Sequence, residues 1–592
     1  MTCQFTQFFV VLCMLYATSL VLTIVDEDVK RSKVEINAIN LTDGIKPEHL
    51  KVEEFDKAAV SSDIGQCSTV GKNILKRGGS AVDGAIATLL CLGTVQFPYS
   101  GIGGGGFMLV YSRKEKKTYG FDYRETVPAN LNKKVFENRK KKKEYGGLAV
   151  AVPGEVKGFV SAWKKFGKLK WSELVQPSID IAKEGFKVLE PPTEAGKDSM
   201  AKSDSNLRKL LLKQEEPEII WKSVIKRPDY AKTLEKIRDA PNSMYEGELA
   251  DIMVSDIKKK GGVMEKSDLK NYQVKMRKPI TMKIKDLTLH TLPLPTGGPT
   301  VIHTLEICKN FKFSNEDFST EEKTVLTYHR VLEAIKFANA FRPYFSDPDY
   351  PKNKTQLEEL FKSILDPEMA KKHFKMIDDE KTHDITYYSK ALNARDDHGT
   401  AHISVLAENG DAVSATSSLN LKYGAHFLSD TTGILYNDQL GDSYTVDSDE
   451  HKFTASEENL PKPFSRPLSA VAPNIIVDDN GDVRMISGGA GGTKVPGSIA
   501  WIIMMKFWFG MDFGNSMMAG RLHHCLFPNE VKEYEAFPVK KFIHDGLKKK
   551  DHKITVGSER TVLQAIYREG KDGKIYSKTD PRRHTRAKTD GY

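Results

Sequence analysis

The stretch DHGTAHISVLAENGDAVSAT, residues 397–416, decides the fold. Two runs rich in apolar and β-branched residues, 400–407 and 412–416, flank the pair Asn409-Gly410. Asn-Gly between such runs is the strongest short hairpin signal, because both residues tolerate the positive φ of a tight turn. The stretch therefore predicts two antiparallel strands, with Thr400 near the start of the first.

A second hairpin is predicted further along the chain. Residues 474–477 and 483–487 flank Asn480-Gly481 in the same way, and the cluster GGAGGT at 488–493 follows directly. Glycines at the end of a strand allow two backbone N–H groups to point at one spot, which is the requirement of an oxyanion hole. The cluster is therefore a candidate for stabilising a negatively charged oxygen.

Before residue 400 helical patterns dominate. Residues 80–92 form an apolar stretch with Ser80 at its start, and residues 325–341 carry apolar side chains at helical spacing before Pro343. The polar stretch 443–465 is typical of a long loop over a site. With no internal repeat, the pattern indicates one continuous α/β enzyme.

Composition excludes several classes of protein. The chain has 592 residues, 40% of them hydrophobic and 28% charged, and its 44 Gly and 26 Pro form no repeat, which excludes disorder and collagen. The net charge of +9 is small for this length. The basic runs at 139–143, 258–260 and 548–550 are short and scattered, so we interpret them as solvated loops rather than a nucleic-acid surface.

The N-terminal segment has the features of a targeting sequence. Residues 8–25 form an uncharged, mostly apolar run of about 27 Å as a helix, long enough to span a bilayer yet also close to a signal-peptide core. Residues 1–25 are therefore a cleaved signal peptide or a single-pass anchor, and the sequence leaves both open. Either places the remaining chain outside the cell or at its surface, which fits glycosylation sequons at Asn40 and Asn353.

Neither a metal nor a nucleotide cofactor is expected. The cysteines outside the leader, Cys67, Cys91, Cys308 and Cys525, have no CxxC spacing and allow three pairings, and the chain has no HExxH or EF-hand pattern. Residues 101–106 (GIGGGG) satisfy GxGxxG with an Asp about 20 residues on. A helix and a proline precede this motif and an apolar strand-like stretch follows it, which is the wrong context for NAD.

Several motifs together resemble the γ-glutamyltransferase family. They are FDYRET around Arg124, the row TSSLN at 416–420, NDQLGD at 437–442, RPLS at 466–469 and the GGAGGT cluster. The resemblance extends in order and spacing from about Ala58, through SGIGGGGFMLVY, YHRVLEA and SDPDY, to the terminal DPRRHTRAKTDGY. It thus covers nearly the whole chain after the leader.

The resemblance implies an α/β fold, the four-layer αββα sandwich of N-terminal-nucleophile hydrolases, formed by two chains from one precursor. The precursor would cut itself at Gly399-Thr400, leaving a large subunit, 26–399, and a small catalytic subunit, 400–592. A Thr hydroxyl needs a base, and the freed α-amino group of Thr400, with a pKa of about 7.7 to 8.0, is suited to that role near neutral pH. No cofactor is needed.

The resemblance also implies a substrate and the residues that hold it. A γ-glutamyl group carries an α-carboxylate and an α-ammonium, so its site needs a cation and donors on one side and anions or acceptors on the other. Donors would be glutathione and related γ-glutamyl amides, and acceptors would be water, amino acids or dipeptides. The residues expected to bind the carboxylate are Arg124 and Ser469, those for the ammonium are Asp442, Gln439 and Asn420, those for the oxyanion are Gly491 and Gly492, and those that position Thr400 are Thr416 and Ser418.

Other residues depart from the family pattern or have no assigned role. Ala470 stands where many members have a second Ser, and Gln439 where vertebrate members have Glu. The family's disulfide corresponds to Cys67 and Cys91, which leaves Cys308 and Cys525 as expected buried thiols. Asp397 and His398 are interpreted as a solvated loop before the cut, and His402 as structural.

Two alternatives of different class remain. One is a catalytically inactive, uncleaved surface-binding protein, which the intact Thr400 and Arg124 argue against. The other is an acylase of the same fold that acts on glutaryl amides. A glutaryl group has no ammonium, so Asp442 would have no partner in the substrate, and rates on γ-glutamyl and glutaryl amides distinguish the two.

Overall fold

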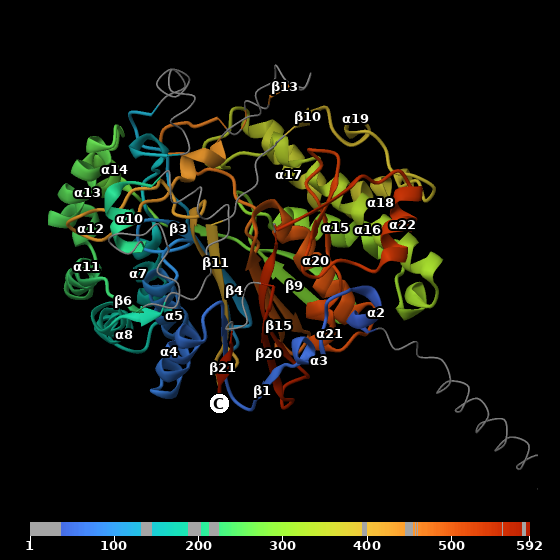
Figure 1. The fold of residues 1–592 in the computed structure, drawn as a ribbon, viewed down its shortest axis with the longest axis horizontal. Helices are drawn as coiled ribbons and strands as arrows, with labels where there is room; N and C mark the ends of the chain where they lie inside the picture. Colours follow the sequence, from blue (N-terminus) through green and yellow to red (C-terminus); the bar gives the residue numbers. More distant parts are fainter. Residues whose placement is uncertain are drawn as a thin grey trace, which may run out of the picture.

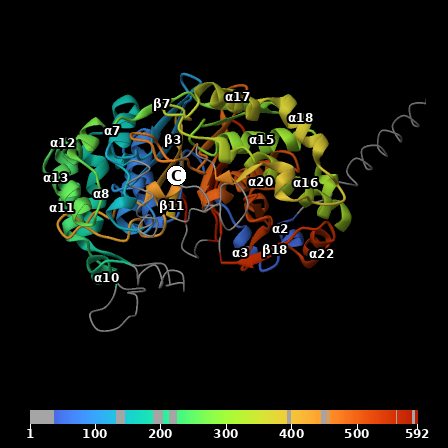
Figure 2. The same ribbon diagram turned by 90° about the horizontal axis from the view of Figure 1, so that it is seen from above.

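The computed structural model describes residues 37–131, 145–187, 203–211, 224–392, 399–443, 454–455, 458, 460–558, 560–582 and 588–592. The N-terminal segment 1–25, Asp397, His398, the basic run 139–143 and most of the polar loop 443–465 lie outside these residues. Figures 1 and 2 show helices on both sides of two central sheets.

Two seven-stranded sheets form the centre of the molecule. The first has the order β21 (Asp590–Gly591), β2 (Ala59–Ser62), β11 (Gly399–Leu406), β12 (Ala412–Asn420), β3 (Gly105–Ser112), β4 (Lys117–Tyr123) and β7 (Lys275–Arg277). The second has the order β1 (Glu53–Phe55), β20 (Ile575–Thr579), β19 (Val562–Arg568), β15 (Val483–Ala490), β14 (Asn474–Asp478), β9 (Leu287–Thr291) and β8 (Ile280–Ile284). Each sheet contains strands from before and after Thr400, and in the second sheet four strands that follow Thr400 lie between strands that precede it, so the two expected subunits share both sheets.

The sheets face each other across an apolar core. Leu109 and Leu406 of the first sheet pack in one buried cluster with Ile475, Ile486 and Ile566 of the second. β11 contacts β15 and β19 directly. Every residue of β11 and β12 is buried. In β11 the apolar residues Ala401, Ile403 and Val405, which belong to the core cluster beneath the helices, alternate with Thr400, His402 and Ser404.

Helices cover the outer face of each sheet, which completes the predicted four-layer αββα sandwich. Against the first sheet lie α4 (Gly65–Lys76), α5 (Ala81–Val95), α7 (Glu155–Phe166) and α8 (Trp171–Glu184), followed outward by α11 (Pro228–Asp239), α12 (Ser243–Glu246), α13 (Glu248–Lys259) and α14 (Lys266–Asn271). Against the second lie α15 (Gly298–Lys309), α16 (Glu321–Asn339), α20 (Val495–Phe507) and α21 (Phe513–Met518), with α17 (Lys354–Leu365), α18 (Pro367–Met376) and α22 (Lys541–Lys549) outside.

Short elements complete the chain. The helices are α2 (Ala38–Leu41), α3 (Pro47–Leu50), α10 (Ser205–Leu211) and α19 (Ile385–Tyr388). The strands are β5 (Phe186–Lys187), β6 (Val224–Ile225), β10 (Ala391–Leu392), β13 (Thr454–Ala455), β16 (Leu522–His524), β17 (Val531–Tyr534) and β18 (Ile554–Gly557).

The predicted local elements are confirmed. β11 pairs antiparallel with β12 around Asn409-Gly410, and β14 pairs with β15 around Asn480-Gly481. The apolar helix is α5, whose N-terminus is capped by Ser80 Oγ accepting from the backbone N–H of Asp83. Residues 107–111 belong to strand β3, as the exclusion of an NAD site required.

The disulfide that the resemblance implied is present. Cys67 in α4 and Cys91 in α5 are bonded, with their Cα atoms 5.4 Å apart. Cys308 is a buried thiol as expected, whereas Cys525 is only half-buried.

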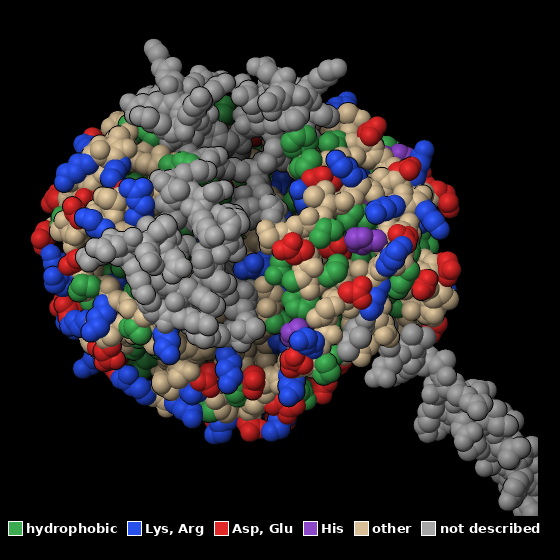
Figure 3. Space-filling view, viewed as in Figure 1, with side chains coloured by type: hydrophobic (Ala, Val, Ile, Leu, Met, Phe, Trp, Pro, Cys, Tyr) green, Lys and Arg blue, Asp and Glu red, His purple; other side chains and the backbone are tan. Residues whose placement is uncertain are grey.

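The surface agrees with the composition. Lys/Arg and Asp/Glu side chains are mixed over the visible face in Figure 3, and the basic residues 258–260 are exposed at the end of α13. Asn40 and Asn353 are both exposed. Within the described residues, no helix has the length and apolarity required to cross a bilayer.

Candidate active site

Thr400 lies at the start of β11, next to a polar neighbour on β12. Its register partner is Ser418, whose Oγ lies 3.0 Å from Thr400 Oγ1. Ser418 Oγ also donates to the carbonyl oxygen of Gly399 at 2.8 Å and accepts from the N–H of Asn420 at 3.0 Å. The strand register shifts between Gly399 and Thr400, so the irregularity coincides with the expected cleavage bond. The Ser418 hydroxyl thus contacts both the Thr400 hydroxyl and the carbonyl oxygen of Gly399.

Thr416, the other residue expected to position Thr400, lies two pairs further along the ladder. It is the partner of His402, and its Oγ1 lies 2.9 Å from His402 Nδ1. Complete burial lowers the pKa of His402 to about 3, so its ring is neutral. A Cβ on Gly488 would lie 2.1 Å from the ring, which means that this strand passes directly against it. Thr416 therefore positions His402, which has the structural role expected of it.

The second glycine cluster lies across the sheet interface from Thr400. β15 ends at Ala490, and Gly491 and Gly492 have φ of 132° and 61°, both in the left-handed region. A Cβ on Gly491 would lie 2.8 Å from the carbonyl oxygen of Arg560. Glycine is thus required by backbone conformation at both positions and by packing at the first. Both residues line the same pocket as Thr400.

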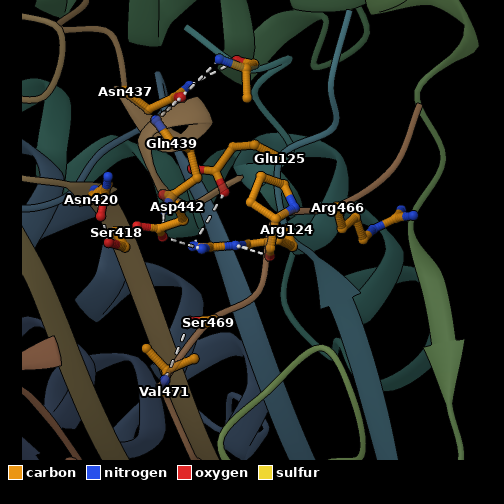
Figure 4. A network of polar contacts seen from close by, with 12 residues as sticks. Arg124, Glu125, Ser418, Asn420, Asn437, Gln439, Asp442, Arg466, Ser469 and Val471 are labelled. Atoms are coloured by element: carbon orange, nitrogen blue, oxygen red, sulfur yellow. Dashed lines mark hydrogen bonds and ion pairs between the residues drawn. The ribbon is translucent and has the colours of Figure 1, made fainter. Parts of the chain in front are cut away.

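Arg124, directly after β4, is at the centre of a buried charge network (Figure 4). Its Nη2 donates to Asp442 Oδ2 at 2.6 Å and to the carbonyl oxygen of Leu468 at 2.9 Å, and its Nε donates to that of Pro467 at 3.1 Å. The Nε2 of Gln439 donates to the same oxygen of Asp442 at 2.5 Å. Arg124 is 1% exposed. The carboxylate-binding and ammonium-binding residues are therefore paired with each other.

The turn that carries Gln439 and Asp442 is held by Asn437. The Asn437 side chain donates to the carbonyl oxygens of Gly103 and Ala151, both at 2.8 Å, and its Oδ1 accepts from the N–H of Gln439 at 3.0 Å. A Cβ on Gly103 would lie 2.1 Å from the carbonyl oxygen of Leu435. The first glycine cluster thus supports the substrate-binding turn through close backbone approach.

Asn420 and Ser469 complete the expected set. Asn420 Nδ2 donates to the carbonyl oxygen of Asp438 at 3.2 Å. Ser469 Oγ accepts from the N–H of Val471 at 3.3 Å, so its own proton is available to a ligand. Gly297 lies behind this segment, because a Cβ on it would lie 2.5 Å from the carbonyl oxygen of Ala470.

One small pocket joins the two groups of residues. It is lined by Thr400, Ser418, Arg124, Gln439, Ser469, Gly491 and Gly492, together with Val471, Gly489, Ala490 and Val495. Asp442 and Asn420 do not line the pocket themselves, but they are hydrogen-bonded to residues that do. Thr416 lies beside His402. A hydroxyl nucleophile, two flexible N–H groups and an ion pair are the components of an acyl-transfer site for a charged substrate.

Two buried acids were missed by sequence reasoning. Burial raises the pKa of Glu125 to about 7, although its Oε2 lies 3.8 Å from Arg124 Nη1. Burial also raises the pKa of Glu155 to about 8, and Ser417 on β12 donates to its carboxylate. Adjacency to Arg124 in the sequence is the only signal that could have identified Glu125.

One buried group in the described residues has the composition of a metal site, namely His329, Glu333 and His552. His329 Nδ1 lies 2.8 Å from His552 Nε2, and the Glu333 carboxylate accepts from Thr382 and Tyr388 at 2.6 and 2.5 Å. Lys336 Nζ lies 3.5 Å from Glu333. The side chains of this group already have hydrogen-bond partners within the protein. The positive charge of the Lys336 ammonium also disfavours the binding of a metal cation.

The architecture and the pocket together define an N-terminal-nucleophile hydrolase. The solved cephalosporin acylase from Bacillus halodurans superposes with a TM-score of 0.77 at 25% identity, over 92% of this chain and 97% of that one.

The chain belongs to the γ-glutamyltranspeptidase family, whose model, Gamma-glutamyltranspeptidase, matches residues 67–589. It is 35% identical over 535 residues to Scoloptoxin SSD14 of Scolopendra dehaani, covering 89% of this chain and 92% of that protein. It is 33% identical over 547 residues to Glutathione hydrolase 2 of Arabidopsis thaliana, with the same coverage. Glutathione hydrolase 5 proenzyme of Mus musculus is 32% identical over 553 residues, 90% of this chain and 92% of that protein.

Proposed function

We propose that this chain is a glutathione hydrolase and γ-glutamyltransferase that cleaves itself at Gly399-Thr400 and then uses Thr400 as its nucleophile. The observation that carries the proposal is the single pocket lined by Thr400, Arg124 and the glycine pair. The products of cleavage would be a large subunit, 26–399, and a small subunit, 400–592. Since both sheets contain hydrogen-bonded strands from each subunit, the two would remain together as a heterodimer.

Self-cleavage would begin with attack of Thr400 Oγ1 on the carbonyl carbon of Gly399. The new C–O bond forms as the C–N bond breaks, and the proton of the hydroxyl passes to the departing nitrogen. The position of Ser418 Oγ, 3.0 Å from Thr400 Oγ1 and 2.8 Å from the Gly399 oxygen, supports a role in this step. The amino group of Thr400 is free once the C–N bond has broken, and water then hydrolyses the ester, which restores the Thr400 hydroxyl and releases Gly399 as a carboxylate.

Turnover would repeat this chemistry on a substrate. The free amine of Thr400 takes the hydroxyl proton, Oγ1 attacks the γ-carbonyl of glutathione, and Cys-Gly leaves with that proton. Gly491 and Gly492 N–H groups would stabilise the oxyanion, a contribution typically near 3 kcal/mol per donor. Water resolves the γ-glutamyl ester to glutamate, while an amino acid or dipeptide amine gives a new γ-glutamyl peptide.

The ion pair between Arg124 and Asp442 supports recognition of a substrate head with both charges. A zwitterion can exchange with the pair, because its carboxylate replaces Asp442 on Arg124 while its ammonium replaces Arg124 on Asp442. A carboxylate alone would displace Asp442 from Arg124 and offer no ammonium in exchange, and the loss of a buried ion pair costs several kcal/mol. The site is thus matched to γ-glutamyl rather than glutaryl amides.

The glutaryl acylase remains the second candidate, because the fold is shared with a cephalosporin acylase. The test compares hydrolysis of matched γ-glutamyl and glutaryl anilides by the wild type, Asp442→Asn and the distant control Asp482→Asn. We expect the wild type and the control to prefer γ-glutamyl by at least about 100-fold. Asp442→Asn should reduce that preference mainly through KM. Equal rates on the two substrates in the wild type would reject the proposal.

We also propose that the protein acts outside the cell or at its surface. The Cys67–Cys91 disulfide and the exposed sequon residues Asn40 and Asn353 support this location, because disulfides persist in oxidising compartments. Treatment of secreted protein with a glycosidase that removes N-linked glycans should lower its mass. A reduced Cys67 in protein from its native cells would contradict the location.

A further inference from the structure

A second small cavity lies within the helical layer that covers the second sheet. Its walls are residues 328–335 of α16, residues 497–501 of α20, and Arg521 and Leu522 at the start of β16. It shares no lining residue with the pocket at Thr400. Its volume of about 10 Å³ is close to the minimum for one water molecule or one monatomic ion.

Two walls of this cavity carry buried N–H donors that are not used within the protein. Arg521 donates through Nη2 to Asp580 and to the carbonyl oxygen of Thr561, the latter at 3.3 Å. Its Nε and Nη1, and the indole Nε1 of Trp501, are buried and have no hydrogen-bond partner among the described residues. The Arg521 side chain is 2% exposed. Such donors are costly to bury unless an acceptor meets them.

The charge around Arg521 is also unbalanced. The carboxylate of Asp580 is shared by two guanidinium groups, because Arg582 Nη1 lies 3.2 Å from Asp580 Oδ1. All three side chains are buried, so the cluster has a net charge of +1. Burial, together with the neighbouring Arg582, lowers the pKa of Arg521 to about 10. No residue that lines the cavity is acidic.

We propose that this cavity binds a monatomic anion of the size of chloride between Arg521 and Trp501. An anion accepts from all three donors and neutralises the cluster, whereas a water molecule accepts two hydrogen bonds at most and adds no charge. The ion would tie α20 to α16 and β16. Because α20 begins at Val495, directly after Gly491 and Gly492, the ion would also support the helix that follows the oxyanion loop. This inference does not depend on the proposed activity.

Bromide is the probe, because its anomalous scattering distinguishes it from water. We expect crystals of the wild type grown in sodium bromide to show an anomalous peak next to Arg521 and Trp501. Trp501→Phe keeps an aromatic side chain next to Tyr328, whose ring centroid lies 4.8 Å from that of Trp501, but removes the N–H, and should lose or weaken the peak. Trp508→Phe, at the C-terminal end of the same helix and outside the cavity, should retain it.

A solution measurement gives an independent result. At constant ionic strength, the melting temperature of the wild type should rise with chloride, replacing the bulky anion gluconate, and should reach a plateau as a single site saturates. Trp501→Phe should need several-fold more chloride for the same shift, and Arg521→Lys should show none. Water alone in the cavity, a bromide peak only at molar concentration, or equal chloride responses in wild type and Trp501→Phe would overturn the proposal.

Discussion

The two ends of the candidate active-site pocket contain different kinds of polar interaction. Around Thr400 the partners described above are neutral: Ser418 Oγ lies 3.0 Å from Thr400 Oγ1 and donates to the carbonyl oxygen of Gly399 at 2.8 Å. Around Arg124 they are ionic, with a carboxylate at 2.6 Å. In the proposed function the first end supplies the nucleophile and the peptide bond that it cuts, and the second end binds the zwitterionic head of the substrate. Bond chemistry and substrate binding are therefore separable by mutation.

The largest effect is expected at the first end. Thr400→Ala removes the only atom that can attack, so it should abolish both self-cleavage and turnover, leaving one chain by denaturing electrophoresis. Thr400→Ser keeps the hydroxyl and should still be cut, at a lower rate. Cleavage of Thr400→Ala would show that another group attacks Gly399.

Arg124→Ala tests the other end. It should leave self-cleavage intact and lower kcat/KM for a γ-glutamyl amide by about 10²- to 10³-fold, chiefly through KM, because a charge-assisted contact to the substrate carboxylate is lost. Arg124→Lys keeps the positive charge but loses the planar guanidinium group, so its kcat/KM should lie between those of the wild type and Arg124→Ala. If Arg124→Ala also blocked cleavage, the separation of the two ends would be wrong.

Glu155 lies behind the end of the pocket that contains Thr400. It tests whether ionisation of a buried carboxyl group there affects the stability of the protein. Its pKa is raised from 4.5 to about 8, so its contribution to stability is fully present below pH 4.5 and is lost as pH rises to 8. The shift corresponds to a loss on the order of 5 kcal/mol above pH 8. Glu155→Gln should flatten the fall in stability between pH 5 and pH 8, measured by chemical denaturation. An unchanged slope would show that this carboxyl does not titrate in that range.

The disulfide provides a comparison outside the pocket. Removing it with the double variant Cys67→Ala, Cys91→Ala should lower the free energy of unfolding by about 3.5 kcal/mol in the entropic model for a 24-residue loop. Self-cleavage and KM should stay close to wild type at a temperature where the variant is folded. A changed KM would mean that α4 and α5 help to shape the substrate site.

The sequence predicts local elements of the fold, such as turns and a helix cap, but not how distant segments assemble into the two sheets. The two Asn-Gly turns and the Ser80 cap depend on residues within a few positions of each other, and all are confirmed. The sequence pattern placed helices before residue 400, yet seven of the fourteen strands in the two large sheets precede that position. The strand β2 has only four residues, all of them buried, and no alternating pattern that would reveal it.

The candidate active site also has features that the sequence predicts and features that it does not. Motif resemblance placed Thr400, Ser418, Arg124 and the glycine pair in one pocket. The bond between Arg124 and Asp442 joins residues 318 positions apart, and no local pattern encodes it. Thr416 was expected beside Thr400, but its register pairs it with His402, because the strand irregularity at Gly399 and Thr400 fixes which side chains are opposite.

The central claim is that the chain is cut before Thr400. The most direct test is the denatured mass of protein expressed through a secretory pathway, combined with N-terminal sequencing of its smaller chain. We expect two chains, the smaller beginning Thr400-Ala401-His402. A single uncut chain that is correctly folded would contradict the claim and would favour an inactive binding protein of the same fold.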